Sequence, residues 1–96
     1  MPFVRHVTLV ANTVSSVAIT DNSSVIEVLS RNGLGEVFIS HDGSVDPTNP
    51  TVGGNDFDVI PASAGAALQF RRIGTRTATV ELISAAATTV SVRGIA

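Results

Sequence analysis

Short runs of alternating apolar and polar residues recur along this chain, and turn residues separate them. Val, Ile and Thr make up nearly a third of the 96 residues. Their side chains branch at Cβ and fit a pleated strand better than a helix. No window places apolar residues at the i, i+3, i+4, i+7 spacing over the length of a helix. The pattern therefore predicts strands over residues 3–10, 14–20, 25–30, 36–40, 58–60, 67–72, 77–84 and 88–93.

Seven to eight short strands in so short a chain are typical of a small antiparallel β-sandwich or a jelly-roll-like barrel. We therefore expect an all-β fold, with residues 1–96 forming a single β-sandwich domain. The domain is expected to carry a flexible N-terminal arm, residues 1–5, and a long loop, residues 41–57. The dipeptide Asn32-Gly33 predicts a tight hairpin turn, because both residues tolerate positive φ.

Alternation within the runs also predicts which side chains face the core. The residues expected to point inward are Val7, Leu9, Val17, Ile19, Val37, Ile39, Leu68, Phe70, Val80, Leu82, Val90 and Val92. The run 25–30 is apolar on both sides apart from Glu27. This pattern indicates either a central strand or a strand whose second face meets a partner.

Charged residues are scarce, at 15% of the chain, against roughly 25% in an ordinary soluble domain. A surface with few charges costs little to desolvate, and this favours a protein that functions as part of an assembly. The alternative is a Thr-rich β-domain that is simply monomeric. The net charge is −2 and no basic tract occurs, so we expect no nucleic-acid partner. No run approaches the roughly 18 apolar residues of a membrane helix, and the start does not resemble a signal peptide.

The sequence offers little for catalysis, and we expect neither an enzyme nor a cofactor. It has no cysteine and no G-x-S-x-G motif. His6 and His41 are each more typical of a surface residue than of a general base. Asp42, Ser44 and Asp46 place oxygen atoms two residues apart, as calcium loops do. The glycine and the bidentate Glu of an EF-hand are missing, so an acidic turn without metal is the expectation.

Several short motifs follow one another from residue 25 onward. They are Glu27-Val28-Leu29 with Arg31 and Gly33, Phe38, Asp42-Gly43, Thr51-Val52-Gly53-Gly54, Asp56, Val59-Ile60-Pro61-Ala62 and Val80-Glu81-Leu82-Ile83-Ser84-Ala85. In this order they resemble small β-rich virion proteins of tailed phages that infect actinobacteria. The resemblance extends over residues 7–92 and consists of turns and strand patterning. Ile60 departs from it where such proteins often show Leu.

The resemblance implies a phage capsid decoration, or cement, protein that binds the outside of the assembled shell and stabilises contacts between major capsid subunits. It implies a virion protein made in the host cytoplasm, with the major capsid protein as partner. A homotrimer is expected, because shell lattices offer three-fold positions. Two alternatives stay open: a tail or head–tail structural subunit, and a carbohydrate-binding module for host attachment.

Two regions are the expected contacts with a partner. The arm can extend and add a strand to the edge of a neighbouring sheet, and long loops in small domains are often functional. The candidate residues are Pro2, Phe3, Val4, Arg5, Val45, Pro47, Pro50, Val52 and Phe57.

Overall fold

A computed structural model of the chain describes residues 4–20, 23–41, 49–55, 57–71 and 78–95. This part of the chain contains strands and no helix. The strands are β1 (Val4–Thr8), β2 (Ser15–Ile19), β3 (Val25–Ser30), β4 (Val37–Ser40), β5 (Asp58–Ile60), β6 (Ala67–Arg71), β7 (Ala78–Ser84) and β8 (Thr89–Gly94). Each lies within, or one residue beyond, a run of alternating residues in the sequence. The all-β prediction is therefore confirmed.

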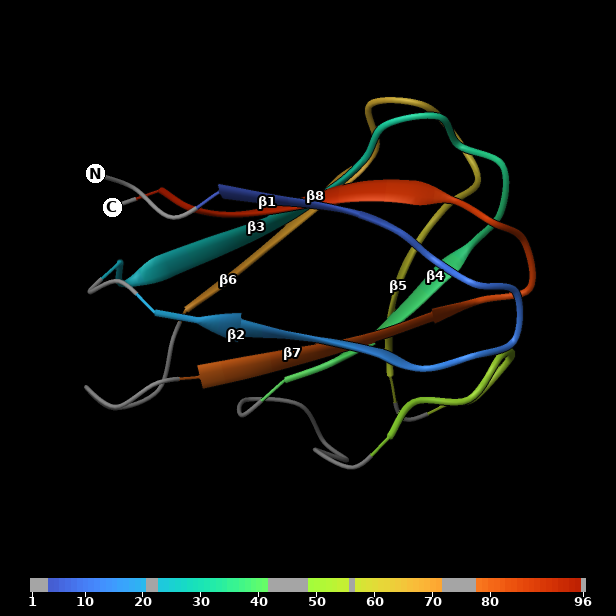
Figure 1. Ribbon diagram of the computed structural model, residues 1–96, viewed down its shortest axis with the longest axis horizontal. Coiled ribbons are helices and arrows are strands. Elements are labelled where there is room, and N and C mark those ends of the chain that lie inside the picture. The colour runs from blue at the N-terminus through green and yellow to red at the C-terminus, as the bar shows by residue number, and fades with distance from the viewer. Residues whose placement is uncertain (1–3, 21–22, 42–48, 56, 72–77, 96) are drawn as a thin grey trace.

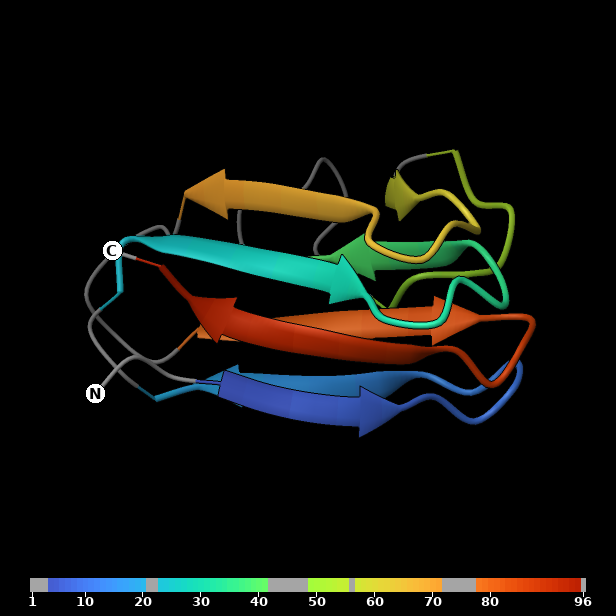
Figure 2. The same ribbon diagram turned by 90° about the horizontal axis from the view of Figure 1, so that it is seen from above.

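The strands form two antiparallel sheets of four, which face each other (Figures 1 and 2). One sheet, here sheet A, has the order β1-β8-β3-β6, and the other, sheet B, has the order β2-β7-β4-β5. Four of the pairs are nested along the chain: β1 with β8, β2 with β7, β3 with β6 and β4 with β5. One long hairpin rolled into two sheets gives this order, which is that of a double-sheet jelly roll.

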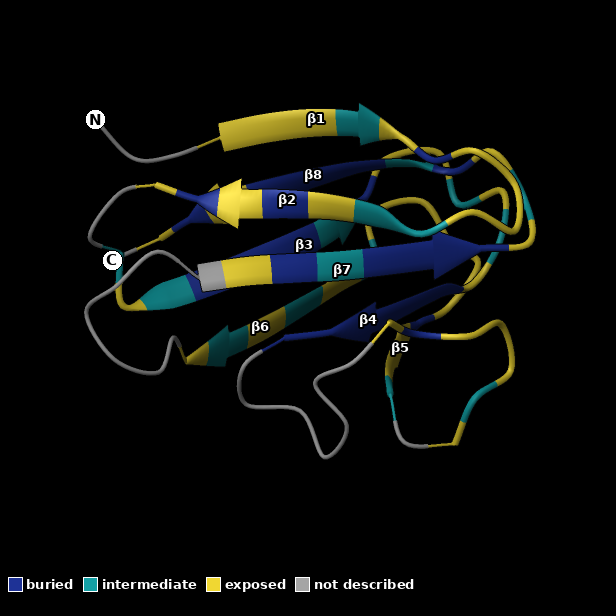
Figure 3. Ribbon diagram, turned by 60° about the horizontal axis from the view of Figure 1, so that its bottom comes forward, coloured by how far each residue is buried: buried dark blue, intermediate teal, exposed yellow. Residues whose placement is uncertain are grey.

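The core lies between the sheets and is built from the inward side chains of the strands. Figure 3 marks the buried residues along the ribbon in dark blue. The fully buried members of the core are Leu9, Val17, Ile19, Ile26, Val28, Val37, Ile39, Ile60, Val80, Leu82, Val90 and Val92. Val7, Leu68 and Phe70 are partly buried and pack against them. Every inward residue expected from the alternation therefore faces the core. The strand β3 is central in sheet A, between β8 and β6.

The expected hairpin at Asn32-Gly33 is wrong. The strands before and after it, β3 and β4, belong to different sheets, so the segment crosses from one sheet to the other. Gly33 does adopt a positive φ of 62°. The Asn32 side chain instead accepts a hydrogen bond from the backbone N–H of Thr89 through Oδ1, at 3.1 Å. The Asn-Gly signature indicates a local backbone conformation, and it does not determine which strands pair.

Four connections between the sheets meet at one end of the sandwich, opposite the two termini (Figure 1). We call this set the loop end. It consists of residues 9–14, 31–36, 61–66 and 85–88, which join β1 to β2, β3 to β4, β5 to β6 and β7 to β8. All of these residues lie in the described part of the chain. The loop end is therefore the part of the molecule outside the sheets that the structure defines most completely.

Candidate functional site

Hydrogen bonds link the four segments of the loop end into one row. The backbone N–H of Leu9 donates to the Thr88 carbonyl at 2.9 Å, which joins the first segment to the fourth. The Thr88 hydroxyl donates to the Gly35 carbonyl at 3.5 Å, which brings in the second. The backbone N–H of Gly65 donates to the carbonyl of Ser30, at the end of β3, at 2.8 Å. The third segment is thereby fixed beside the second, so the loop end is a connected surface.

The exposed surface of the loop end is apolar and poor in charge. Val10 and Leu34 are 64% and 63% exposed, the highest fractions among the large hydrophobic residues described. Arg31 and Glu36 are its charged residues. The Arg31 side chain reaches sideways to His6 on sheet A. Exposed apolar side chains on a connected surface with little charge are typical of a site that binds another protein.

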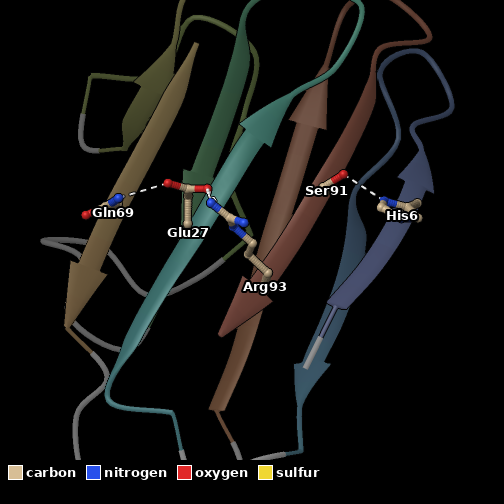
Figure 4. Close-up of polar contacts among 5 residues, drawn as sticks. All are labelled: His6, Glu27, Gln69, Ser91 and Arg93. Carbon is tan, nitrogen blue, oxygen red and sulfur yellow. Dashed lines mark hydrogen bonds and ion pairs between the residues drawn. The ribbon is translucent and has the colours of Figure 1, made fainter. Parts of the chain in front are cut away.

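The outer face of sheet A carries a row of polar side chains centred on Glu27 (Figure 4). In the registers of β3 with its two neighbours, Glu27 lies opposite Gln69 on β6 and Arg93 on β8. The Gln69 amide nitrogen donates to Glu27 Oε2 at 2.8 Å. Arg93 Nε donates to Glu27 Oε1 at 2.8 Å, and Arg93 Nη2 lies 2.7 Å from the same oxygen. Glu27 is only 7% exposed. Both of its carboxylate oxygens accept hydrogen bonds from protein groups, as buried polar atoms generally do.

Hydrogen bonding to the charged form lowers the pKa of Glu27. The bond from Gln69 is the largest cause, burial opposes it, and the hydrogen bond and positive charge of Arg93 lower the pKa further. The ordinary value is 4.5, and the folded value lies below it. The charged form is therefore stabilised in the folded state, where it bonds to two neighbouring strands.

Glu27 is expected to make folding stability fall in acid. Because its folded pKa is depressed, the stabilisation is present above pH 4.5 and is lost as the pH falls through the folded pKa. The Glu27→Gln variant should lose about 1–3 kcal/mol near neutral pH. It should also show a flatter decline in the free energy of unfolding below pH 4.5. Urea titrations across this range measure both, with Glu36→Gln, an exposed carboxyl of the loop end, as the control. Parallel declines for wild type and Glu27→Gln would contradict the assignment.

A shallow groove runs over β8 on the same face. Its lining residues are Val4, His6, Leu29, Arg31, Ser91 and Arg93, and its volume is about 350 Å³. His6 Nδ1 lies 2.7 Å from the Ser91 hydroxyl and 3.3 Å from an Arg31 guanidinium nitrogen. The groove therefore brings together three strands, two arginines and a histidine.

The residues expected in the N-terminal arm fall on both sides of the boundary of the described chain. Val4 and Arg5 lie in β1, opposite Arg93 and Val92 of β8. They are therefore part of sheet A, and Val4 lines the groove. The candidates Pro2 and Phe3 lie outside the described residues.

The candidates in the long loop are not brought together with those of the arm in the groove. Pro50 is buried, Phe57 is half-buried, and Val52 is 43% exposed. Val45 and Pro47 lie outside the described residues. Each stays a predicted contact, and among the three described candidates of this loop Val52 is the one whose side chain is open to solvent.

His41, expected at the surface, is instead buried. It is 8% exposed and follows β4, where its ring stacks on Phe70 of β6 with centroids 3.8 Å apart and an angle of 10°. Its Nε2 lies 3.1 Å from Asp58 Oδ2. The flat imidazole therefore covers the end of the core between the two sheets. The other histidine, His6, is exposed, as expected.

The described part of the chain offers neither a metal site nor a membrane-spanning helix. No group of three or more His, Cys, Asp or Glu side chains there could hold a metal ion. The oxygen ligands considered for calcium, Asp42, Ser44 and Asp46, lie outside it. Nor does that part contain a helix with the length and apolar character needed to cross a membrane.

Comparisons with known proteins add no assignment. No protein-family model, no curated protein and no solved structure matches the chain.

Sequence reasoning missed the loop end and, of the residues that line the groove, found only Val4. The loop end depends on which connections meet, and this follows from strand order. The groove depends on the register that places His6 opposite Ser91. One signal was available: a lone carboxylate in an otherwise apolar run, Glu27, indicates a buried charge that needs a cation nearby. Which cation supplies it, here Arg93, could not be known without the pairing of β3 and β8.

Proposed function

We propose that this chain is a capsid decoration protein that binds the outside of an assembled phage shell through its loop end. The observation that carries the proposal is the exposure of Val10 and Leu34 on a connected, charge-poor surface. Burying one such side chain at an interface contributes about 1.5–3 kcal/mol. The resemblance to virion proteins of actinobacterial phages supplies the kind of partner.

The proposed partner is the major capsid protein, and the proposed assembly is a homotrimer at the points where three capsid subunits meet. A small domain gains most by repeating its contacts around a symmetry axis. A domain that bridges neighbouring capsid subunits binds the intact shell and not the separated subunits. Its binding energy therefore opposes their separation. The virion exterior is the corresponding location.

The aromatic residues favour this role over carbohydrate binding. Sugar-binding sites commonly use an exposed aromatic face, and Tyr or Trp adds a polar tip. The chain has neither Trp nor Tyr. Of its phenylalanines, Phe38 is 9% exposed and Phe70 faces the core, where it stacks on His41.

The thermal rupture of shells tests the function. Stripped shells should rupture at a lower temperature than decorated ones, and added protein should restore the transition. Each site contributes RT ln(1 + [L]/Kd), about 2.7 kcal/mol at about 100 times Kd. Restoration should persist in raised salt, because Arg31 and Glu36 are the charges of the loop end. Identical rupture temperatures with and without the protein would overturn the proposal.

A further inference from the structure

The strand β1 presents an open backbone edge. The N–H of Leu9 donates to the carbonyl of Thr88, and antiparallel pairs alternate between bonded and non-bonded along the ladder. Val7 and Arg5 lie two and four residues before Leu9, so in this register they also bond to β8. The backbone N–H and C=O groups of the intervening residues, Val4, His6 and Thr8, therefore point away from β8. Among the described residues β1 pairs with β8 alone.

The side chains of the same residues of β1 lie on the outer face of sheet A, beside the groove. Ser91 lies opposite His6 on one side and opposite Leu29 on the other. Because its side chain is small, it leaves a trough over β8 between two ridges of larger side chains. Val4 and Leu29 give this trough apolar walls, and Arg31 lies across it.

Arg31 is a cation without a carboxylate partner among the described residues. The other arginine of the groove, Arg93, is neutralised by Glu27. The Arg31 guanidinium instead donates a hydrogen bond to His6 Nδ1 at 3.3 Å. That nitrogen accepts only while His6 is unprotonated. A guanidinium binds a carboxylate through two parallel, charge-assisted hydrogen bonds, which are stronger than a bond to a neutral ring.

Charge decides what can add to this edge. A second copy of β1 paired antiparallel through this edge would set Arg5 against Arg5 in one register and His6 against His6 in the next. Like charges directly opposite each other destabilise a strand pair. A strand that carries acidic side chains on the outer face of sheet A would instead complement Arg31. An extended chain also satisfies the open backbone groups, which is how peptides augment a sheet.

We infer that the β1 edge and the groove beside it form a docking site for an extended acidic segment of another protein. The segment adds to sheet A as a strand beside β1 and places a carboxylate on Arg31. The inference does not rest on the proposed capsid function, since it needs no shell and Arg31 is the one groove residue that also belongs to the loop end.

The test uses the free protein and two terminally blocked peptides, one alternating Thr and Glu and the other alternating Thr and Gln. Titrations followed by amide NMR give both the affinity and the location. The Glu peptide should shift the amides of Val4, His6 and Thr8, because those groups face the open edge. It should bind about three to ten times more tightly than the Gln peptide, the range expected for one partly exposed charge-assisted pair.

Variants separate the charge from the edge. Arg31→Gln should remove the preference for Glu over Gln, while Arg71→Gln, with the same change of net charge on the far strand β6, should retain it. Thr8→Pro removes an outward N–H, a substitution that edge strands tolerate, and should weaken both peptides. An unchanged melting temperature shows that each variant is folded.

Four results would overturn the inference. They are equal affinity for the two peptides, amide shifts away from β1, an Arg31→Gln variant that still prefers Glu, and no binding of either peptide at millimolar concentration. Acetate that shifts the same amides with the affinity of the Glu peptide would reduce the groove to a simple anion site. That result would also overturn the docking of a segment.

Discussion

The Gly33→Ala variant is expected to lose about 2–4 kcal/mol of folding stability. Gly33 adopts a φ of 62°, and a left-handed residue with a Cβ costs about 1–2 kcal/mol by itself. The added Cβ would also overlap the backbone N of Ala64 and lie 2.6 Å from the carbonyl carbon of Ser63. Backbone atoms cannot rotate away as a flexible side chain can, so two segments of the loop end must separate. The melting temperature should fall by roughly 10–25 °C.

A second glycine of the loop end provides the control. Gly65 has a φ of 88°, and a Cβ built there meets nothing within 4 Å. Gly65→Ala should therefore show the conformational cost alone, about 1–2 kcal/mol. Urea unfolding of both variants measures the difference. Equal losses would mean that the close approach of residues 31–36 to residues 61–66 adds nothing to stability.

The Leu34→Asp variant should lose most of its affinity for shells while remaining folded. Leu34 is 63% exposed, so the substitution should change the free energy of unfolding by about 0.5 kcal/mol or less. At an interface it removes an apolar contact and adds a charge that must be desolvated, at a combined cost of about 2–4 kcal/mol. That corresponds to a rise in Kd of roughly 30- to 1000-fold.

Ile95→Asp is the matched control for this variant. Ile95 is 41% exposed and follows β8, at the opposite end of the sandwich from the loop end. It should bind shells like the wild type. If Leu34→Asp binds normally, or if both variants lose the same affinity, the loop end is not the contact surface.

The strands could be predicted from the sequence because alternation is a local property. Val17 and Ile19, or Val37 and Ile39, are two residues apart and must share a face once the chain is extended. These assignments required no knowledge of which strands pair.

The candidate surfaces could not be predicted because they depend on contacts that are distant in sequence. Arg31 and His6 are 25 residues apart, and Arg93 and Glu27 are 66 apart. A change of one residue in register would separate each pair by moving the side chains to opposite faces. Asn32-Gly33 illustrates the same limit, since its local signature was compatible both with a hairpin and with a crossing between sheets.

Counting bound copies tests directly whether the domain decorates a shell. Wild-type protein is mixed with stripped shells and, separately, with isolated tails, and the bound protein is measured after sedimentation. A decoration protein should show saturable binding to shells in proportion to the number of capsid subunits, and none to tails. A few copies on tails, with none on shells, would contradict it.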